Sequence, residues 1–215
     1  MYYKMDVFKS EEKYDCDNFD VHIEWKTSKG SGFSGGKLIR YLSDSKKIKI
    51  PDGIETIGKE AFVDGSFGFY NPPLEEVVIP ASVKKIEEGA FLGTRIAEIK
   101  IAPGASCGII KNQALFSCDG KTLLWILGNA DEPYVVYEGR DEICVYKVPE
   151  GVDNIANDFC NNYDALIDVL ELPASVIKIG ELDQSFCDRF PVIRAPKGSN
   201  AIRIAKSRGW EYEEM

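Results

Sequence analysis

The side chains that most often carry catalysis are sparse in this sequence. Its one histidine is His22, and no serine or cysteine that looks activated lies near it along the chain. A serine or cysteine nucleophile needs a base within hydrogen-bonding reach, so Ser-His or Cys-His chemistry is not expected. His22 falls on the polar face of the strand expected at 19–26, where we expect a solvated side chain. The sequence therefore predicts no catalytic residue and no enzyme.

Cysteines could bind a metal or form disulfides, but their spacing favours neither. The six are Cys16, Cys107, Cys118, Cys144, Cys160 and Cys187. No Cys-x-x-Cys pair occurs, so a zinc site lacks its usual ligand spacing. We expect buried thiols that pack as small apolar groups, with Cys160 and Cys187 in one buried column. Spacing alone leaves disulfide pairing open.

Two short motifs look like ligand-binding loops, and their surroundings argue against both. Gly30-x-Gly32-x-x-Gly35 matches a dinucleotide fingerprint, but that fingerprint needs a following helix, and a strand is expected by Ile48. Asp15-x-Asp17-x-x-Asp20 lacks the glycine and the glutamate of a calcium loop. The first motif is predicted to be a hairpin linker and the second a solvated acidic turn, so no cofactor or metal is expected.

Charge and hydropathy exclude two classes of partner. A net charge of -9 over 215 residues opposes nucleic-acid binding, which depends on a basic surface. No window of about 18 apolar residues occurs, so no membrane span is expected. The first residues are too charged for a signal peptide. The chain is then either cytoplasmic or one from which a leader was trimmed, and its compartment stays open.

A repeated sequence pattern determines the fold in which the residues considered so far must lie. The segment 51–62 is written again at 80–91, with looser copies at 149–159 and 173–186. A short apolar alternation such as Ile48-Lys-Ile50 precedes each proline. This alternation recurs at intervals of about 22 to 29 residues, apart from one interval of about 47 that spans two periods. The array therefore holds about six copies, with one replaced.

The period decides the fold class. A repeat of about 23 residues with one short strand per copy is typical of leucine-rich-repeat solenoids. No copy can bury its own apolar stripe, so neighbouring copies must stack into one core. The expected fold is an α/β repeat solenoid with one short strand and one short helical arm per repeat. In each copy the proline ends the strand, and residues such as Ile57 and Phe62 pack inward.

The repeated letters also resemble a known family. The combination I-x-I-P-x-[GS]-[VI]-x-x-I-x-x-x-A-F at 48–62 and 77–91 is similar to the BspA-type leucine-rich repeat, also called the Treponema pallidum type. The resemblance extends from Gly36 to the C-terminus. Such proteins are mostly bacterial surface proteins that bind other macromolecules. The resemblance therefore implies a binding scaffold with a role in adhesion or host interaction, at the cell surface or secreted.

Three parts are expected along the chain. Residues 1–36 form a strand-rich cap with a Gly-rich linker. Residues 37–198 form the solenoid, with a hairpin inserted at about 112–139 around Asp119-Gly120, which is a strong hairpin signal. Residues 199–215 form a C-terminal cap, in which Ser199 begins a helix that Gly209 ends, while Trp210 and Tyr212 seal the last repeat.

The repeat predicts a candidate binding face. In each copy the residue between the last two apolar positions must point outward, and stacking aligns these residues in a column about 5 Å apart. The column is Lys49, Val78, Lys100, Lys147, Glu171 and Arg194. It is either a recognition face for an acidic or extended partner, or a solvated sheet with charge pairs such as Glu98 beside Lys100.

A second candidate is the insertion at 64–73, which offers Phe67, Phe69 and Tyr70 from a glycine-rich loop. The same aromatic residues could instead fold back over the array. Binding to a protein partner of unknown identity is the expected function, and the alternative is a structural module of a larger surface protein. The oligomeric state cannot be read from the sequence.

Overall fold

The computed structural model describes most of the chain. The described residues are 21–27, 33–41, 46–62, 74–92, 94, 96–127, 135–138, 141–160, 167–182 and 190–215. They belong to two compact units, Met1–Gly108 (unit 1) and Ile109–Met215 (unit 2), and each unit is considered by itself. The candidate loop with Phe67, Phe69 and Tyr70 lies outside the described residues.

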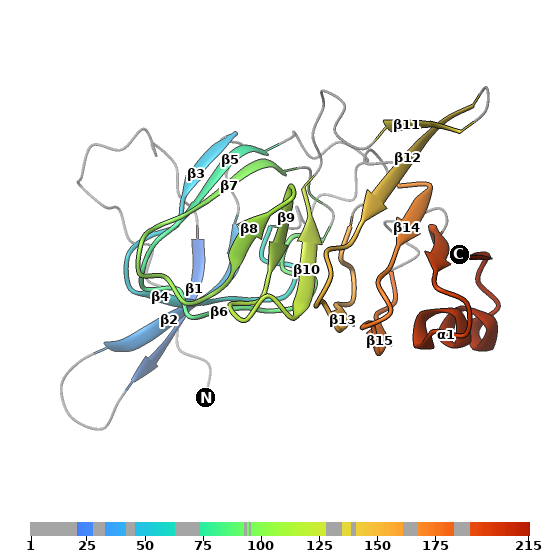
Figure 1. Cartoon of the computed structure of the whole chain (residues 1–215). Helices are drawn as coiled ribbons and strands as arrows, with labels where there is room; N and C mark the ends of the chain where they lie inside the picture. The colour runs from blue at the N-terminus through green and yellow to red at the C-terminus, as the bar shows by residue number, and fades with distance from the viewer. Residues whose placement is uncertain are drawn as a thin grey trace. The chain divides into compact units, whose positions relative to one another are not determined.

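Unit 1 contains two sheets, to which the repeats contribute alternately (Figure 1). One sheet holds the first strand of each repeat, in the order β3 (Lys47–Lys49), β5 (Leu74–Ile79) and β7 (Ile96–Ile101). The other holds, in order, β1 (Val21–Thr27), β2 (Phe33–Tyr41), β4 (Ile54–Ile57) and β6 (Lys85–Ile86). All neighbours are parallel except the β1–β2 hairpin. We call the parallel series β3-β5-β7 the first ladder and β2-β4-β6 the second ladder.

Unit 2 has the same plan. Its first ladder is β12 (Asp141–Lys147), β14 (Val169–Glu171), β16 (Val192–Ala195) and β17 (Tyr212–Glu214), with β11 (Val135–Glu138) antiparallel to β12. Its second ladder is β10 (Thr122–Ile126), β13 (Asn154–Ile155) and β15 (Lys178–Ile179). The strands β9 (Ala114–Phe116) and β8 (Ile109–Lys111) extend the second sheet in antiparallel fashion.

The prediction of one strand and one helical arm per repeat is wrong for the described residues. The repeats that begin with β3, β5, β12 and β14 each make two short strands, and the only helix of the described segments is α1 (Asn200–Arg208). The arm, which is the part of each repeat after the proline, is too short to form a stable helix, because isolated helices of fewer than about 12 residues are marginal in water. It is also rich in β-branched residues such as Ile54 and Ile57. Its backbone bonds to a neighbouring strand of the second ladder instead, as when Gly58 N–H donates to Leu38 C=O of β2 at 2.9 Å.

The proline of each repeat ends the first strand, as predicted. In two repeats a glycine turns the chain with a positive φ, of 91° at Gly53 and 88° at Gly151. The other two carry serine there, and its hydroxyl joins neighbouring repeats. Gly53 N–H donates to Ser82 Oγ at 3.1 Å, and Ser175 Oγ donates to Val152 C=O at 2.6 Å. The turn is therefore made either by a glycine with a positive φ or by a serine that bonds to the neighbouring repeat.

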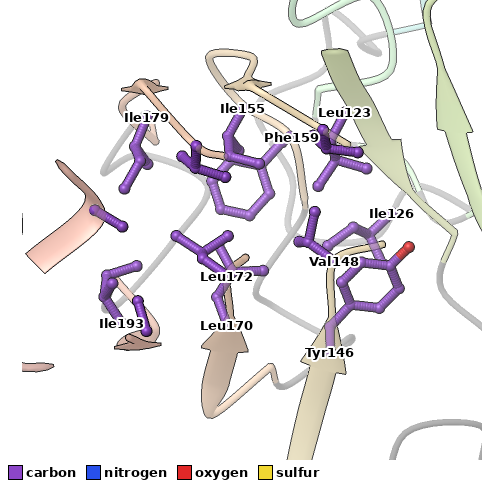
Figure 2. Close-up of a cluster of buried hydrophobic side chains, with 14 of the residues drawn as sticks. Leu123, Ile126, Tyr146, Val148, Ile155, Phe159, Leu170, Leu172, Ile179 and Ile193 are labelled. Carbon is purple, nitrogen blue, oxygen red and sulfur yellow. The ribbon is translucent and has the colours of Figure 1, made fainter. Parts of the chain in front are cut away.

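In each unit the core lies between the two ladders. Figure 2 shows the core of unit 2, where Ile155 and Ile179 point toward Leu170 and Ile193, with Phe159 among them. Phe159 is fully buried. These side chains come from different repeats, so no repeat has a core of its own.

Aromatic rings from successive strands form a column in the core of unit 1. The rings of Tyr41 and Phe62 lie 5.9 Å apart, and those of Phe62 and Phe91 stack at 5.3 Å. In unit 2, Phe190 packs on Phe159 at 6.1 Å. Phe186, which was expected in this column, lies outside the described residues. The repeat's phenylalanine therefore packs against its counterpart in the next repeat.

The hairpin around Asp119-Gly120 is confirmed, with β9 and β10 as its strands. Its turn is held by Asp119 Oδ1, which accepts from Ser117 Oγ at 2.6 Å; this bond lowers the pKa of the Asp119 carboxyl. The hairpin was expected as an insertion, yet β10 takes a place in the second ladder. Leu123 stands beside Ile155, which stands beside Ile179. The hairpin thus supplies the second strand of the degenerate repeat.

The helix α1 follows its predicted signals. Ser199 accepts from Ile202 N–H at the helix start, and Gly209 ends the helix with a φ of 69°. Ala205 and Ile202 are buried. Trp210 stacks on Phe190 at 3.8 Å. Tyr212, expected to seal the core, is 42% exposed because it lies in β17, a strand that the sequence did not suggest.

We expect the substitution Gly180→Ala to destabilise the protein. A Cβ at Gly180 would lie 2.3 Å from Ala156 C=O, so the two neighbouring strands would have to separate. The expected loss in free energy of unfolding is about 1–3 kcal/mol, typical of overpacking, measured by urea denaturation.

The control for this prediction is Gly198→Ala, which meets no atom within 4 Å but has a φ of 74°. It tests backbone strain without a clash, and we expect a loss of about 1 kcal/mol. An equal or smaller loss for Gly180→Ala than for the control would contradict the close approach of the strands.

Candidate binding face

The register of each first ladder aligns the residues of the candidate face. In unit 1, Lys49 stands beside Val78, and Val78 beside Lys100. In unit 2, Lys147 stands beside Glu171, and Glu171 beside Arg194. We call these two rows the outer rows. The alignment within each unit is as the repeat predicts, and binding by these residues stays a prediction.

Sequence reasoning missed one member of the outer row in unit 2. Glu213 of β17 stands beside Arg194 and continues the row. The template of apolar residues does not continue past residue 195, so β17 could not be recognised as a further rung. The alternation of an aromatic and an acidic residue at Tyr212 and Glu213 is typical of a strand, but two residues are too few to predict one.

Carboxylates neutralise Lys100 of the outer row in unit 1. Lys100 forms an ion pair with Glu76, and its Nζ lies 3.3 Å from Glu98 Oε2. The hydrogen bond between Lys100 and Glu76 raises the pKa of the lysine and lowers that of the glutamate. The charge pairing of Glu98 with Lys100 is therefore present, as the solvated-sheet interpretation expected.

The outer row of unit 2 is paired in the same way. Lys147 Nζ lies 2.6 Å from Glu171 Oε1, and this hydrogen bond raises the pKa of Lys147. Arg194 Nε lies 2.7 Å from Glu213 Oε2. The row is thus a line of alternating charges with no net charge, which does not favour a purely acidic partner.

An apolar row lies beside the outer row in unit 2. Val145 stands next to Val169, and Val169 next to Val192. Val169 is only 4% exposed, while the other two are half-buried. In unit 1 the corresponding positions are Lys47, Glu76 and Glu98. The two units therefore present different chemistry at equivalent positions, apolar in unit 2 and charged in unit 1.

The second ladder of unit 1 carries its own ion pair. Lys37 Nζ lies 2.8 Å from Glu87 Oε2, which also accepts from Lys59 N–H at 3.0 Å. The hydrogen bond from Lys37 lowers the pKa of Glu87 despite partial burial. Because Lys37 lies in β2 and Glu87 directly follows β6, this pair bridges strands that flank β4.

The described residues offer little for catalysis or metal binding. They contain no group of three or more His, Cys, Asp or Glu side chains arranged to hold a metal. His22 lies in β1, opposite Arg40. Burial and the nearby Asp168 raise the pKa of the Cys144 thiol to about 11, which disfavours the nucleophilic thiolate. The residues from Phe33 onward form strand β2, so the dinucleotide fingerprint lacks its helix.

The remaining cysteines behave in part as predicted. Cys107 and Cys160 are buried, whereas Cys118 is exposed in the hairpin turn. Cys160 belongs to the core of unit 2. Cys16 and Cys187 lie outside the described residues, as do Asp15 and its acidic neighbours. Among the helices that the structure describes, none has the length and hydropathy of a membrane span.

The chain belongs to the BspA-type leucine-rich-repeat family. The family model for the BspA type leucine rich repeat region, which comprises 6 copies, matches residues 65–189. This match covers more than half of the chain. The matched residues extend over parts of both units, and repeat proteins of this kind are generally scaffolds. No curated protein matches the chain.

A solved structure of a bacterial leucine-rich repeat protein is similar in fold. A leucine-rich repeat protein from Eubacterium ventriosum superposes with a TM-score of 0.50 at 18% identity, covering 70% of this chain and 36% of that one. The pneumococcal vaccine antigen PcpA gives a TM-score of 0.43 at 21% identity, covering 63% of this chain and 35% of that one. The chain therefore spans about a third of the length of the proteins it matches.

We expect the Lys37–Glu87 pair to make stability depend on pH. A carboxyl whose pKa is lowered on folding adds stability above its ordinary pKa of 4.5, and this stability is lost as the pH falls through the folded value. Glu87→Gln should therefore lower the free energy of unfolding at neutral pH, by up to about 1 kcal/mol. The difference from the parent protein should shrink toward zero in acid.

The measurement is urea denaturation of both proteins across the acid range. Glu181→Gln is the control, because its side chain is 76% exposed and its closest ion-pair contact is 4.0 Å. A difference for Glu87→Gln that persists unchanged in acid would show that the charge of Glu87 contributes nothing.

Proposed function

We propose that the protein is a non-enzymatic scaffold that binds a protein partner through the strand face of its first ladders. The observation that carries this proposal is the register of those ladders. It places side chains from successive repeats, such as Lys147, Glu171 and Arg194, in straight rows. A rigid surface with regular spacing suits an extended partner, because little ordering of the surface is needed on binding.

The chemistry of the rows favours a partner of mixed character over an acidic one. In unit 2 the row pairs its own charges, as at Lys147 and Glu171. In unit 1 Lys100 pairs with Glu76 and Glu98 of the adjacent row. Such pairs give specificity and orientation more than affinity. In unit 2 the adjacent valines add apolar surface at Val145 and Val192, which are half-buried. We infer that a partner would place apolar side chains along the valines and polar ones along the outer row.

The family supports a scaffold and leaves the setting open. We propose that both units belong to one solenoid, closed by the strand-rich segment at 1–36 and by the helical segment at 199–215, with the hairpin region at about 112–139 in between. The support is the sequence period together with the shared two-ladder plan. A cell-surface or secreted location, with a role in adhesion or host interaction, is proposed from the family alone.

One observation favours the alternative of a structural module. The basic residues Lys100, Lys147 and Arg194 already have carboxylate partners within the chain. A face that satisfies its own charges can serve stability alone. The two candidates differ in whether substitutions on the face alter capture of another protein.

Charge reversal tests the proposal. We expect Lys49→Glu and Lys147→Glu together to reduce partner capture at least about tenfold. Reversing these charges breaks the electrostatic complementarity between the face and its partner, and like charges that face each other weaken binding. Immobilised protein is exposed to extracellular-matrix extract and to lysate of the source cell, and the captured proteins are compared by mass spectrometry.

The control is Lys84→Glu with Lys178→Glu, which makes the same change of charge on residues of the second-ladder side. Melting temperatures should stay within a few degrees for all variants, because each position is exposed or half-buried. Equal capture by parent, face variant and control would favour the structural module instead.

A further inference from the structure

One backbone contact recurs along the second ladder of unit 2. Ala156 N–H donates to Leu123 C=O at 2.9 Å, and Gly180 N–H donates to Ile155 C=O at 2.8 Å. The register of the ladder makes Leu123, Ile155 and Ile179 equivalent. The first two carbonyls point toward the strand that follows them in the ladder. The carbonyl of Ile179, in β15, therefore points away from β13 in the same way.

An arginine side chain occupies the carbonyl that a further strand would use. Among the described residues, β15 is an end strand of its sheet, and α1 packs beside it (Figure 1). Arg208, the last residue of α1, donates from Nη1 to Ile179 C=O at 2.9 Å and to Gly180 C=O at 3.3 Å. The guanidinium thus supplies the donor that the backbone N–H of another strand would supply.

Other contacts hold Arg208 and its helix in place. Arg208 Cζ lies 4.7 Å from the centre of the Trp210 ring, which stacks on Phe190 at 3.8 Å. The helix itself is fixed by the buried side chains of Ile202 and Ala205. Among the described residues, no backbone group of α1 bonds to β15. The side chain of Arg208 therefore makes this contact with the edge without the helix backbone.

The edge that Arg208 covers is complementary to itself. Gly180 N–H bonds toward β13, and neighbouring residues of a strand direct their groups to opposite sides, so both N–H and C=O of Ile179 point away from β13. Two residues with this orientation exchange both hydrogen bonds in an antiparallel pair. Ile179 of a second copy therefore offers the matching donor and acceptor. Ile177 is 60% exposed and adds apolar surface beside this edge.

We propose that Arg208 is an autoinhibitory contact, which prevents β15 from pairing antiparallel with β15 of a second copy. Strand edges pair readily with other chains unless a charge or a covering group protects them. The guanidinium occupies the acceptor that the second copy needs, and two such cations would repel each other across the pair. The Arg208 side chain is 35% exposed, so its removal leaves the carbonyls accessible.

The partner at this edge is the protein itself. Because the same strand is used by both copies, the contact is isologous and closes as a dimer. This inference goes beyond the proposed scaffold function, which concerns the first ladders and a different protein.

Sedimentation equilibrium of the full chain over a range of concentrations tests the inference. We expect Arg208→Ala to dimerise at concentrations at least about tenfold below any at which the parent protein does, because the edge is then open. The average mass should reach a plateau at twice the monomer mass, because an isologous contact closes on itself. The circular dichroism spectrum should be unchanged, since Ile202 and Ala205 still hold α1.

Arg203→Ala is the matched control, because it removes the same charge from an exposed position of the same helix. It should leave the association of the parent unchanged. Adding Ile177→Lys to Arg208→Ala should restore the monomer, since a lysine at a strand edge opposes pairing. Arg208→Gln is a milder second variant that keeps part of the stem beside Trp210, and it should also dimerise.

Three results would overturn the inference: folded Arg208 variants that associate no more than the parent, growth beyond the dimer, or a dimer that persists with Ile177→Lys. None of these substitutions alters the outer rows, so partner capture is measured separately. Monomeric Arg208 variants, together with capture that depends on Lys49 and Lys147, would reject this inference and leave the proposed function standing.

Discussion

Parallel pairing between successive repeats is the interaction on which the structure depends. Each strand is only two to seven residues long in the repeats, as at β13 (Asn154–Ile155) and β12 (Asp141–Lys147), and an isolated strand of this length has no stability in water. Its backbone bonds go almost entirely to neighbouring repeats. The same neighbours supply the apolar contacts of the core, so every repeat is stable only within its unit.

This dependence explains how the repeats tolerate variation at some positions and not at others. The turn after the proline accepts either glycine or serine. Gly53 adopts a positive φ there, whereas the hydroxyl of Ser82 accepts a hydrogen bond from the backbone of the neighbouring repeat. The close approach at Gly180 leaves no such freedom, since a Cβ would meet the backbone of Ala156. Constraints are therefore strictest where two backbones touch, not where side chains fill space.

The ladders also organise charge. Because equivalent residues of neighbouring repeats stand side by side, a lysine in one repeat meets whatever the next repeat carries. Lys147 meets Glu171, and Arg194 meets Glu213. The protein is strongly acidic as a whole, yet these rows are balanced. Any partner at the strand face therefore encounters fixed, ordered pairs.

The sequence by itself determined the family, the period, the inward residues and the register of the outer rows. These follow from spacing, because apolar residues that recur at a fixed interval must share one core, as Ile48 and Val77 do. It also identified the helix from Ser199 to Gly209 and the hairpin at Asp119-Gly120, because their signals are local.

Only the tertiary structure decided that the arms are strands, that β10 replaces a missing strand and that β17 adds one more. The physical reason is that such short segments have no preference strong enough to act alone. Ile155 and Tyr212 become strand residues because a neighbouring strand offers its backbone at the right distance. Which charges neutralise each other was likewise decided by contact between side chains distant in sequence, such as Lys37 and Glu87.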